Sequence, residues 1–126
     1  MDFQKEDIVK WKLGIVGSRN PGISYDDWET LIVSILKLDE ISEIISGGAK
    51  GIDYYAKMLA IKNQIPFKEY NPEYGKYGRK ATLIRNRLIV ENSDKIIAFP
   101  TLGSKGTYHT VSIAKELNKS VIIQNI

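Results

Sequence analysis

Short apolar runs alternate with amphipathic segments along most of this chain, and this alternation limits the fold more than any other feature. Five such runs, rich in β-branched residues, lie at residues 13–16, 43–45, 66–70, 95–99 and 121–123. Short runs in which polar residues do not alternate regularly are typical of strands buried on both faces of a parallel sheet.

The segments between these runs show helical periodicity, over residues 25–38, 51–64, 80–91 and 107–118. Ser24, followed three residues later by Asp27, resembles a capping box at the start of the first helix. The order β-α-β-α-β-α-β-α-β predicts an α/β domain with right-handed crossovers. We expect a Rossmann-like, five-stranded parallel sheet of order 3-2-1-4-5 with helices on both faces.

A chain of 126 residues is long enough for one domain with a real core and too short for two. We therefore expect a single domain over residues 1–126, with residues 1–10 as an N-terminal arm. That arm is polar, without the apolar stretch of a signal peptide, and no apolar run approaches membrane-spanning length. These features predict a cytoplasmic protein with no membrane partner.

The chain has no cysteine and a single histidine, His109. Disulfide bonds, thiolate zinc sites and cysteine nucleophiles are therefore excluded, and a two-histidine metal site or a Ser-His-Asp triad has too few histidines to form. We expect no metal and no cofactor, and we interpret His109 as a surface or packed residue.

In open parallel sheets, ligands bind beyond the carboxyl ends of the strands, where the strand order reverses. The loop after the first apolar run contains Gly17, Ser18 and Arg19. Gly17 lets the chain turn sharply, the Ser18 hydroxyl can donate to an anion, and Arg19 can form two parallel hydrogen bonds with one. An ordinary turn with a surface arginine explains this loop alone equally well.

The loop after the second run is rich in glycine and leads directly into a helix. It contains Gly47, Gly48, Ala49 and Lys50, with Asp53 in the first helical turn. Paired glycines let backbone amides approach a ligand closely, and a helix N-terminus favours negative charge. Asp53 either complements the helix dipole or accepts a hydrogen bond from a ribose hydroxyl.

The loop after the fourth run repeats this chemistry with Pro100, Gly103, Ser104, Gly106 and Thr107. Two glycine-rich loops that each precede a helix in one small domain are a more specific signal than either loop alone. A dinucleotide or a nucleoside phosphate fits between them.

Residues 71–80 form a longer connection that is rich in tyrosine, glycine and cations. We expect it to act as a lid in which Tyr77 stacks on a base and Arg79 or Lys80 contacts phosphate. Arg85 and Asn86, near the start of the following helix, are also candidate site residues, although a solvated helix face would explain them as well.

The net charge is +3, which is too small and too dispersed to indicate nucleic-acid binding. Its distribution is more informative, because segments 17–23, 47–53, 71–87 and 100–107 hold eight lysines and arginines against two carboxylates. The rest of the chain is mildly acidic. This distribution predicts a small anionic, nucleotide-like ligand at the rim of the sheet.

Several of these motifs occur together in a known superfamily. They are Gly17-Ser18-Arg19, SGGAKGID at 46–53, YGKYGRKA at 74–81, IRNR at 84–87 and IAFP at 97–100. With them the chain resembles the YspA-like, YpsA-related branch of the SLOG superfamily, named for the Smf/DNA-processing-protein-A and Lonely Guy (LOG) proteins. The resemblance covers roughly residues 13–121. It implies a Rossmann-like domain that binds nucleotides through its glycine loops, commonly as a homodimer or higher oligomer.

The chain departs from the LOG phosphoribohydrolases at one informative position. Their motif is Pro-Gly-Gly-x-Gly-Thr-x-x-Glu; here Gly106 and Thr107 match, whereas Thr110 stands at the glutamate position. The missing carboxylate favours binding over catalysis. If the chain is an enzyme, we expect an N-glycosidic nucleotide hydrolase with Asp53 as its candidate catalytic carboxylate.

Our first hypothesis is therefore a protein that senses or sequesters an NAD-derived nucleotide signal, such as an ADP-ribose-like or cyclic ADP-ribose-like molecule, as SLOG domains of anti-phage systems do. The alternative is LOG-like cleavage of nucleoside monophosphates. The second alternative is binding of single-stranded DNA, as in DNA-processing protein A. The modest net charge counts against that alternative, so we expect no nucleic-acid partner.

Overall fold

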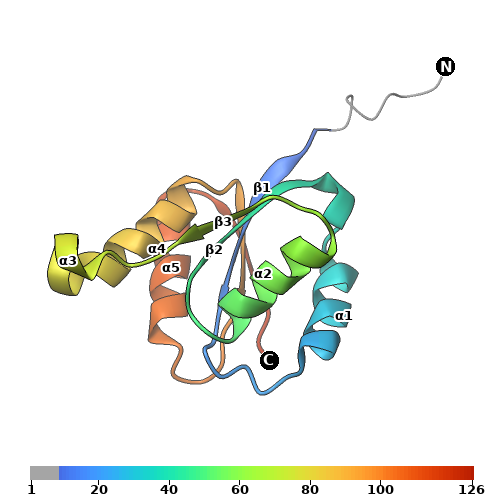
Figure 1. The fold of residues 1–126 in the computed structure, drawn as a ribbon, viewed down its shortest axis with the longest axis horizontal. Coiled ribbons are helices and arrows are strands. Elements are labelled where there is room, and N and C mark those ends of the chain that lie inside the picture. The colour runs from blue at the N-terminus through green and yellow to red at the C-terminus, as the bar shows by residue number, and fades with distance from the viewer. Residues whose placement is uncertain (1–8) are drawn as a thin grey trace.

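Five parallel strands form the centre of the fold in the computed structural model, which describes residues 9–126 (Figure 1). They are β1 (Trp11–Gly17), β2 (Ile41–Gly47), β3 (Phe67–Tyr70), β4 (Lys95–Phe99) and β5 (Ser120–Ile123), in the order β3-β2-β1-β4-β5. This order confirms the predicted α/β, Rossmann-like class. The first eight positions of the expected N-terminal arm lie outside the described residues.

The main helices agree closely with the predicted segments. They are α1 (Tyr25–Ile35), α2 (Ile52–Lys62), α4 (Ala81–Glu91) and α5 (Lys105–Glu116), and the shorter turns are η2 (Leu38–Glu40), α3 (Tyr74–Tyr77) and η3 (Gly78–Lys80). Ser24 Oγ accepts a hydrogen bond from the Asp27 backbone N–H at 3.1 Å, which confirms the predicted cap of α1. The helix ends at Ile35 rather than residue 38, because the next residue, Leu36, is extended.

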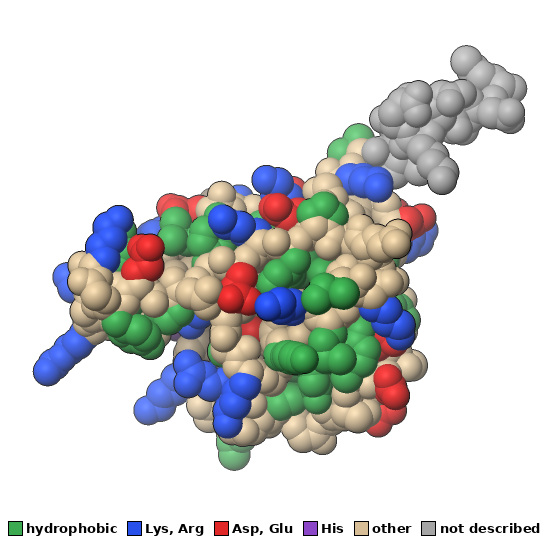
Figure 2. All heavy atoms as spheres, in the orientation of Figure 1, with side chains coloured by type: hydrophobic (Ala, Val, Ile, Leu, Met, Phe, Trp, Pro, Cys, Tyr) green, Lys and Arg blue, Asp and Glu red, His purple; other side chains and the backbone are tan. Residues whose placement is uncertain are grey.

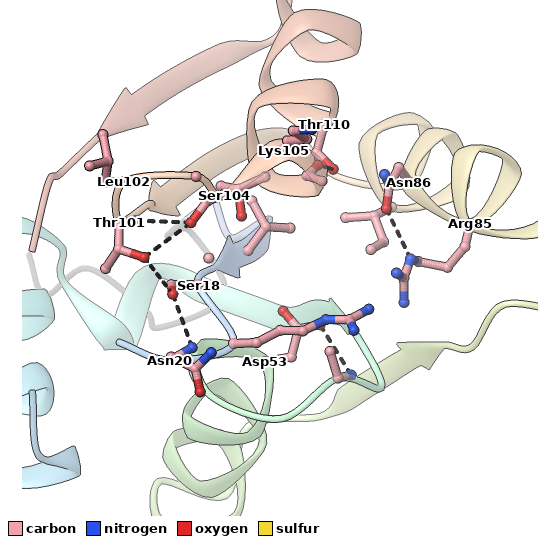
Figure 3. A pocket seen from close by; sticks show the side chains of 18 residues that line it. Ser18, Asn20, Asp53, Arg85, Asn86, Thr101, Leu102, Ser104, Lys105 and Thr110 are labelled. Atoms are coloured by element: carbon pink, nitrogen blue, oxygen red, sulfur yellow. Dashed lines mark hydrogen bonds between the residues drawn. The ribbon is translucent and has the colours of Figure 1, made fainter. Parts of the chain in front are cut away.

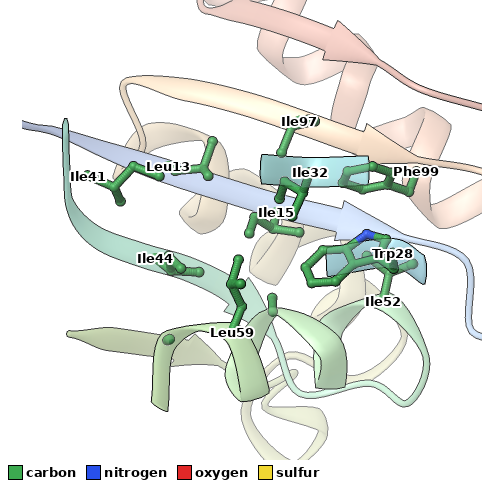
Figure 4. Packing of buried hydrophobic residues seen from close by; sticks show 12 residues of the cluster. Leu13, Ile15, Trp28, Ile32, Ile41, Ile44, Ile52, Leu59, Ile97 and Phe99 are labelled. Atoms are coloured by element: carbon green, nitrogen blue, oxygen red, sulfur yellow. The ribbon is translucent and has the colours of Figure 1, made fainter. Parts of the chain in front are cut away.

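Two hydrophobic clusters hold the helices to opposite faces of the sheet. One lies beneath α1 and α2, where fully buried Trp28 packs edge-on against Phe99 with ring centroids 5.5 Å apart (Figure 4). The other lies beneath α4 and α5 and includes Ile89 and Val111. Burial of each large apolar side chain contributes roughly 1.5–3 kcal/mol, so both clusters fix the helices that carry the loops at the strand ends.

β1 lies in the middle of the sheet and pairs in parallel with both β2 and β4. The last residue of β1, Gly17, is in register with Phe99, the last residue of β4. The loops that follow these two strands therefore begin side by side at the same edge. Within residues 9–126, no helix is long and apolar enough to span a bilayer.

Candidate functional site

The strand order reverses between β1 and β4, and a cavity of about 590 Å³ opens beyond the strand ends at this point (Figure 3). Switch points of this kind are where open parallel sheets bind ligands. The predicted site residues that line this main cavity are Gly17, Ser18, Arg19, Ala49, Asp53, Arg85, Asn86, Gly103, Ser104, Gly106 and Thr107. Four separate elements therefore contribute to one cavity.

The remaining predicted site residues lie elsewhere. Gly47 and Gly48 line a second, smaller cavity beside α2. Lys50 is exposed and Pro100 is buried, and neither lines a described cavity. The segment expected to be a lid, with Tyr77, Arg79 and Lys80, consists of the short turns α3 and η3, which project beyond the start of α4 (Figure 1).

The main cavity also has lining residues that sequence reasoning missed. They are Val16, Asn20, Ile89, Thr101, Leu102, Lys105 and Thr110. Thr101 and Lys105 lie within a glycine-rich loop that was already singled out. Ile89 lies one helical turn after Arg85, so helical spacing could have identified it; Thr110 stands out in the sequence only as the position where LOG enzymes have glutamate.

Backbone contacts hold the β1–α1 loop between its two neighbours. The Ser18 N–H donates to Phe99 O at the end of β4, and the Ile52 N–H donates to Ser18 O, both at 3.0 Å. Gly51, the cap of α2, has φ of +79°, and a Cβ there would collide with the Ser18 carbonyl oxygen. Only glycine fits this conformation and this close approach without strain. The loops after β1 and β2 therefore share one rigid contact.

A hydroxyl network joins the β1–α1 loop to the β4–α5 loop (Figure 3). Thr101 Oγ1 donates to Ser18 Oγ at 2.7 Å, and the Asn20 N–H donates to the same oxygen at 3.0 Å. Ser104 Oγ accepts from the Thr101 N–H at 3.0 Å. Because Ser18 Oγ accepts both of its described hydrogen bonds, its own hydrogen can be directed to a bound anion.

Arg85 is a nearly buried cation at the wall of the cavity, with 8% of its surface exposed. Its Nε donates to Asn86 Oδ1 at 2.9 Å (Figure 3), and Asn86 Nδ2 lies 3.1 Å from His109 Nδ1. An amide nitrogen can only donate, so His109 accepts at Nδ1 in this arrangement. The half-buried His109 thus holds Asn86, and Asn86 in turn orients the guanidinium of Arg85.

Asp53 is a nearly buried carboxyl group at the floor of the cavity. Burial raises its pKa to about 6, although the hydrogen bond from Ser46, the hydrogen bond from the Ala49 N–H and the charges of Arg85 and Arg19 act in the opposite direction. Ser46 Oγ lies 2.6 Å from Ile15 O and 3.1 Å from Asp53 Oδ1. Ser46 is the donor in both contacts, and its hydrogen bond to Oδ1 stabilises the charged form of Asp53.

The charge of the main cavity is positive. Arg19, Arg85 and Lys105 line it from three different elements, against the single carboxyl group of Asp53. Thr110, which stands where LOG enzymes have glutamate, is 1% exposed, lines the cavity and donates to Gly106 O at 3.0 Å. This position therefore does face the cavity, and it brings no second carboxylate. Such a lining suits a phosphate group.

The fold and the site together define a Rossmann-like α/β domain with an open cationic cavity at its topological switch point. The sequence profile of the DNA recombination-mediator protein A family matches residues 4–68, which is more than half of the chain. The chain belongs to this family. No curated protein matches the sequence significantly.

Two solved structures have the same fold. DNA processing protein A from Streptococcus pneumoniae superposes with a TM-score of 0.70 at 24% identity, over 90% of this chain and 50% of that one. DNA processing protein A from Helicobacter pylori, whose structure was described for its mode of binding single-stranded DNA, gives a TM-score of 0.69 at 22% identity, over 97% of this chain and 68% of that one. This chain thus spans half the length of the Streptococcus protein.

These findings correct two predictions. The hypothesis of a sensor or sequestering protein for an NAD-derived signal is wrong, because the family is one of DNA recombination mediators. The expectation of a small nucleotide-like partner and no nucleic acid is overturned by the same family match; DNA processing protein A from Helicobacter pylori is itself described as binding single-stranded DNA. The net charge misled because an acidic scaffold offsets the cations gathered at one edge.

Proposed function

We propose that this chain binds single-stranded DNA and that the main cavity holds part of the sugar-phosphate backbone. One observation carries the proposal: Arg19, Arg85 and Lys105 come from three elements and line the same open cavity at the switch point. Membership of the DNA recombination-mediator protein A family supports DNA as the source of the phosphate.

The polar groups around these cations suit a phosphodiester. Ser18 offers a hydroxyl hydrogen, and Ser104 and Thr107 place further hydroxyl groups at the start of α5. The N-terminus of α5 also favours negative charge. Hydrogen bonds between cations and phosphate are stronger than those between neutral groups. The lining thus recognises the backbone, which is the same in every sequence of DNA.

The depth of the cavity favours a single strand over a duplex. Arg85 is only 8% exposed, so a phosphate must enter the cavity to reach its guanidinium. A flexible single strand can bend its backbone into such a concave site. Duplex DNA, with a persistence length of about 150 base pairs, resists that bend.

A longer strand has a second cationic surface to follow beyond the cavity. Lys76, Arg79 and Lys80 are exposed on α3 and η3, which lead into the helix that carries Arg85, and Tyr77 is half-buried beside them. We infer that these residues contact the strand outside the cavity rather than closing over it. The YspA-like branch and a cytoplasmic location, both expected from the sequence, fit this role and remain predictions.

Fluorescence anisotropy with a labelled twelve-nucleotide single strand tests the proposal. The logarithm of the association constant should fall linearly with the logarithm of the salt concentration, with a slope of about −2 if three phosphates are contacted. A duplex of the same length should bind more weakly. Absence of binding at low salt, or equal affinity for the duplex, would contradict the proposal.

A further inference from the structure

A second cavity, of about 300 Å³, lies beside α2 and next to the main cavity. Its walls come from the outer face of α2, the end of β2 and the edge strand β3. The two cavities share Ala49 and Asp53. A DNA strand that leaves the main cavity across the β2–α2 loop therefore reaches the second cavity directly.

The α2 wall of the second cavity is an exposed apolar stripe. Tyr54, Met58 and Ile61 are 51%, 37% and 69% exposed, and their spacing of four and three residues places them on one face of the helix. Figure 2 shows hydrophobic side chains gathered on the face of the molecule that α2 occupies. A contiguous apolar patch beside polar groups marks a binding surface.

The charged groups of this cavity differ from those of the main cavity. Its charged lining residues are Lys57, Glu69 and the shared Asp53, so the second cavity has no excess of positive charge. Glu69 accepts a hydrogen bond from Asn71 Nδ2 at 2.9 Å, which fixes its carboxylate at the rim. A phosphate would be repelled there. A flat heterocycle with an amino group would gain both the apolar wall and a hydrogen-bond acceptor.

We propose that the second cavity is a nucleobase subsite: one unpaired base of the strand whose backbone occupies the main cavity stacks on Tyr54 and packs against Met58. Glu69 accepts a hydrogen bond from its exocyclic amino group. This inference rests on the proposed function, which places the backbone of the same strand in the adjacent main cavity. Cytosine, which carries an amino group, is then preferred over thymine, which has none.

Two strands of equal length and equal phosphate count test the subsite, one of deoxycytidines and one of abasic residues. We expect wild-type protein to bind the deoxycytidine strand about tenfold more tightly, as a stacked base contributes roughly that factor or more. Tyr54→Ala should remove this advantage and leave the abasic strand unaffected. Tyr54→Phe should keep it, and Val33→Ala, an exposed apolar change on α1, should change neither affinity.

The role of Glu69 has its own readout. Glu69→Gln should reduce the preference for deoxycytidine over thymidine strands, with no change for the abasic strand. The subsite would be overturned if Tyr54→Ala lowered the affinity for the deoxycytidine and abasic strands equally, or if it lowered neither affinity. Two unchanged affinities are also the result expected if this face binds a protein. Failure of the proposed function looks different, because wild-type protein would then bind neither strand.

Discussion

The guanidinium of Arg85 and the carboxyl group of Asp53 both border the space that a side chain on Gly47, at the end of β2, would occupy. A Cβ placed on Gly47 would stand 2.6 Å from Arg85 Nη1 and 2.7 Å from Asp53 Oδ2. Both contacts are shorter than real Cβ atoms make, so these two side chains reach the cavity only because residue 47 has no side chain. The glycine acts here through the space it leaves.

Gly47→Ala should therefore weaken binding of single-stranded DNA about tenfold, since the added methyl group displaces the arginine that contacts phosphate. The free energy of unfolding should fall by about 1–3 kcal/mol, the usual cost of an overpacked site. Anisotropy titration and urea unfolding measure the two effects. Gly75→Ala is the matched control, because nothing lies within 4 Å of a Cβ there; equal loss in both variants would refute the steric explanation.

Removal of the cavity cations should reduce both affinity and its salt dependence. We expect Arg85→Met and Arg19→Ala each to lose about 1.5–3 kcal/mol of binding free energy, the range for hydrogen bonds to charged groups. Each should also make the salt slope about 0.7 less negative. Lys37→Ala removes an exposed cation that follows α1, on the opposite edge of the sheet from the cavity. A loss as large in that control would place the DNA elsewhere.

Asp53→Asn should stabilise the protein at neutral pH and not at acidic pH. The pKa of Asp53 is about 6 in the native state against an ordinary 3.8, so the native state holds the proton more tightly than the unfolded chain. Between pH 3.8 and 6 the free energy of unfolding of the wild type therefore falls as pH rises, by up to about 3 kcal/mol from this group. The neutral amide avoids that loss.

Urea unfolding of wild type and Asp53→Asn at intervals from pH 4 to pH 8 measures this difference. The two stabilities should converge below pH 4 and separate above pH 6. The variant should also bind single-stranded DNA more tightly at pH 7.5, because it removes a negative charge next to Arg85 and Arg19. A stability difference that does not change with pH would contradict the assignment of the titration to Asp53.

Ser18→Ala should loosen the junction between the β1–α1 and β4–α5 loops. The substitution leaves the Asn20 N–H and the Thr101 hydroxyl without their shared acceptor, and an unmade hydrogen bond at a nearly buried site costs about 1–3 kcal/mol. Urea unfolding should record this loss together with weaker DNA binding. Ser112→Ala removes an exposed hydroxyl on α5 and should have almost no effect on either.

The fold could be predicted from sequence because its signals are local. Strands buried on both faces give short apolar runs, and helices packed on one side give a stripe, so β4 was predicted to the residue and the strand order followed from the simplest topology. Leu36 ended α1 early because a residue at the end of a helical pattern can also be extended. That choice depends on packing that no local pattern contains.

The candidate site could be predicted less completely, because its contacts join residues that are far apart in the sequence. The loops were found because glycine, serine and arginine cluster there in sequence. The approach of Arg85 and Asp53 to Gly47, and the position of Tyr54 beside a second cavity, depend on how α4 and α2 pack against the sheet. The net-charge argument against nucleic acid failed because the net charge averages the cationic rim with an acidic scaffold.

The central place of β1 also sets an order of assembly. During synthesis β1, β2 and β3 emerge before β4, which pairs with β1 across some eighty intervening residues. The bonds of Ser18 to Phe99 and Thr101 cannot form until then. Such long-range pairing is slow, so the wall that the β4–α5 loop contributes is the last part of the cavity to form. The main cavity therefore has all of its walls only after β4 and α5 have joined the sheet.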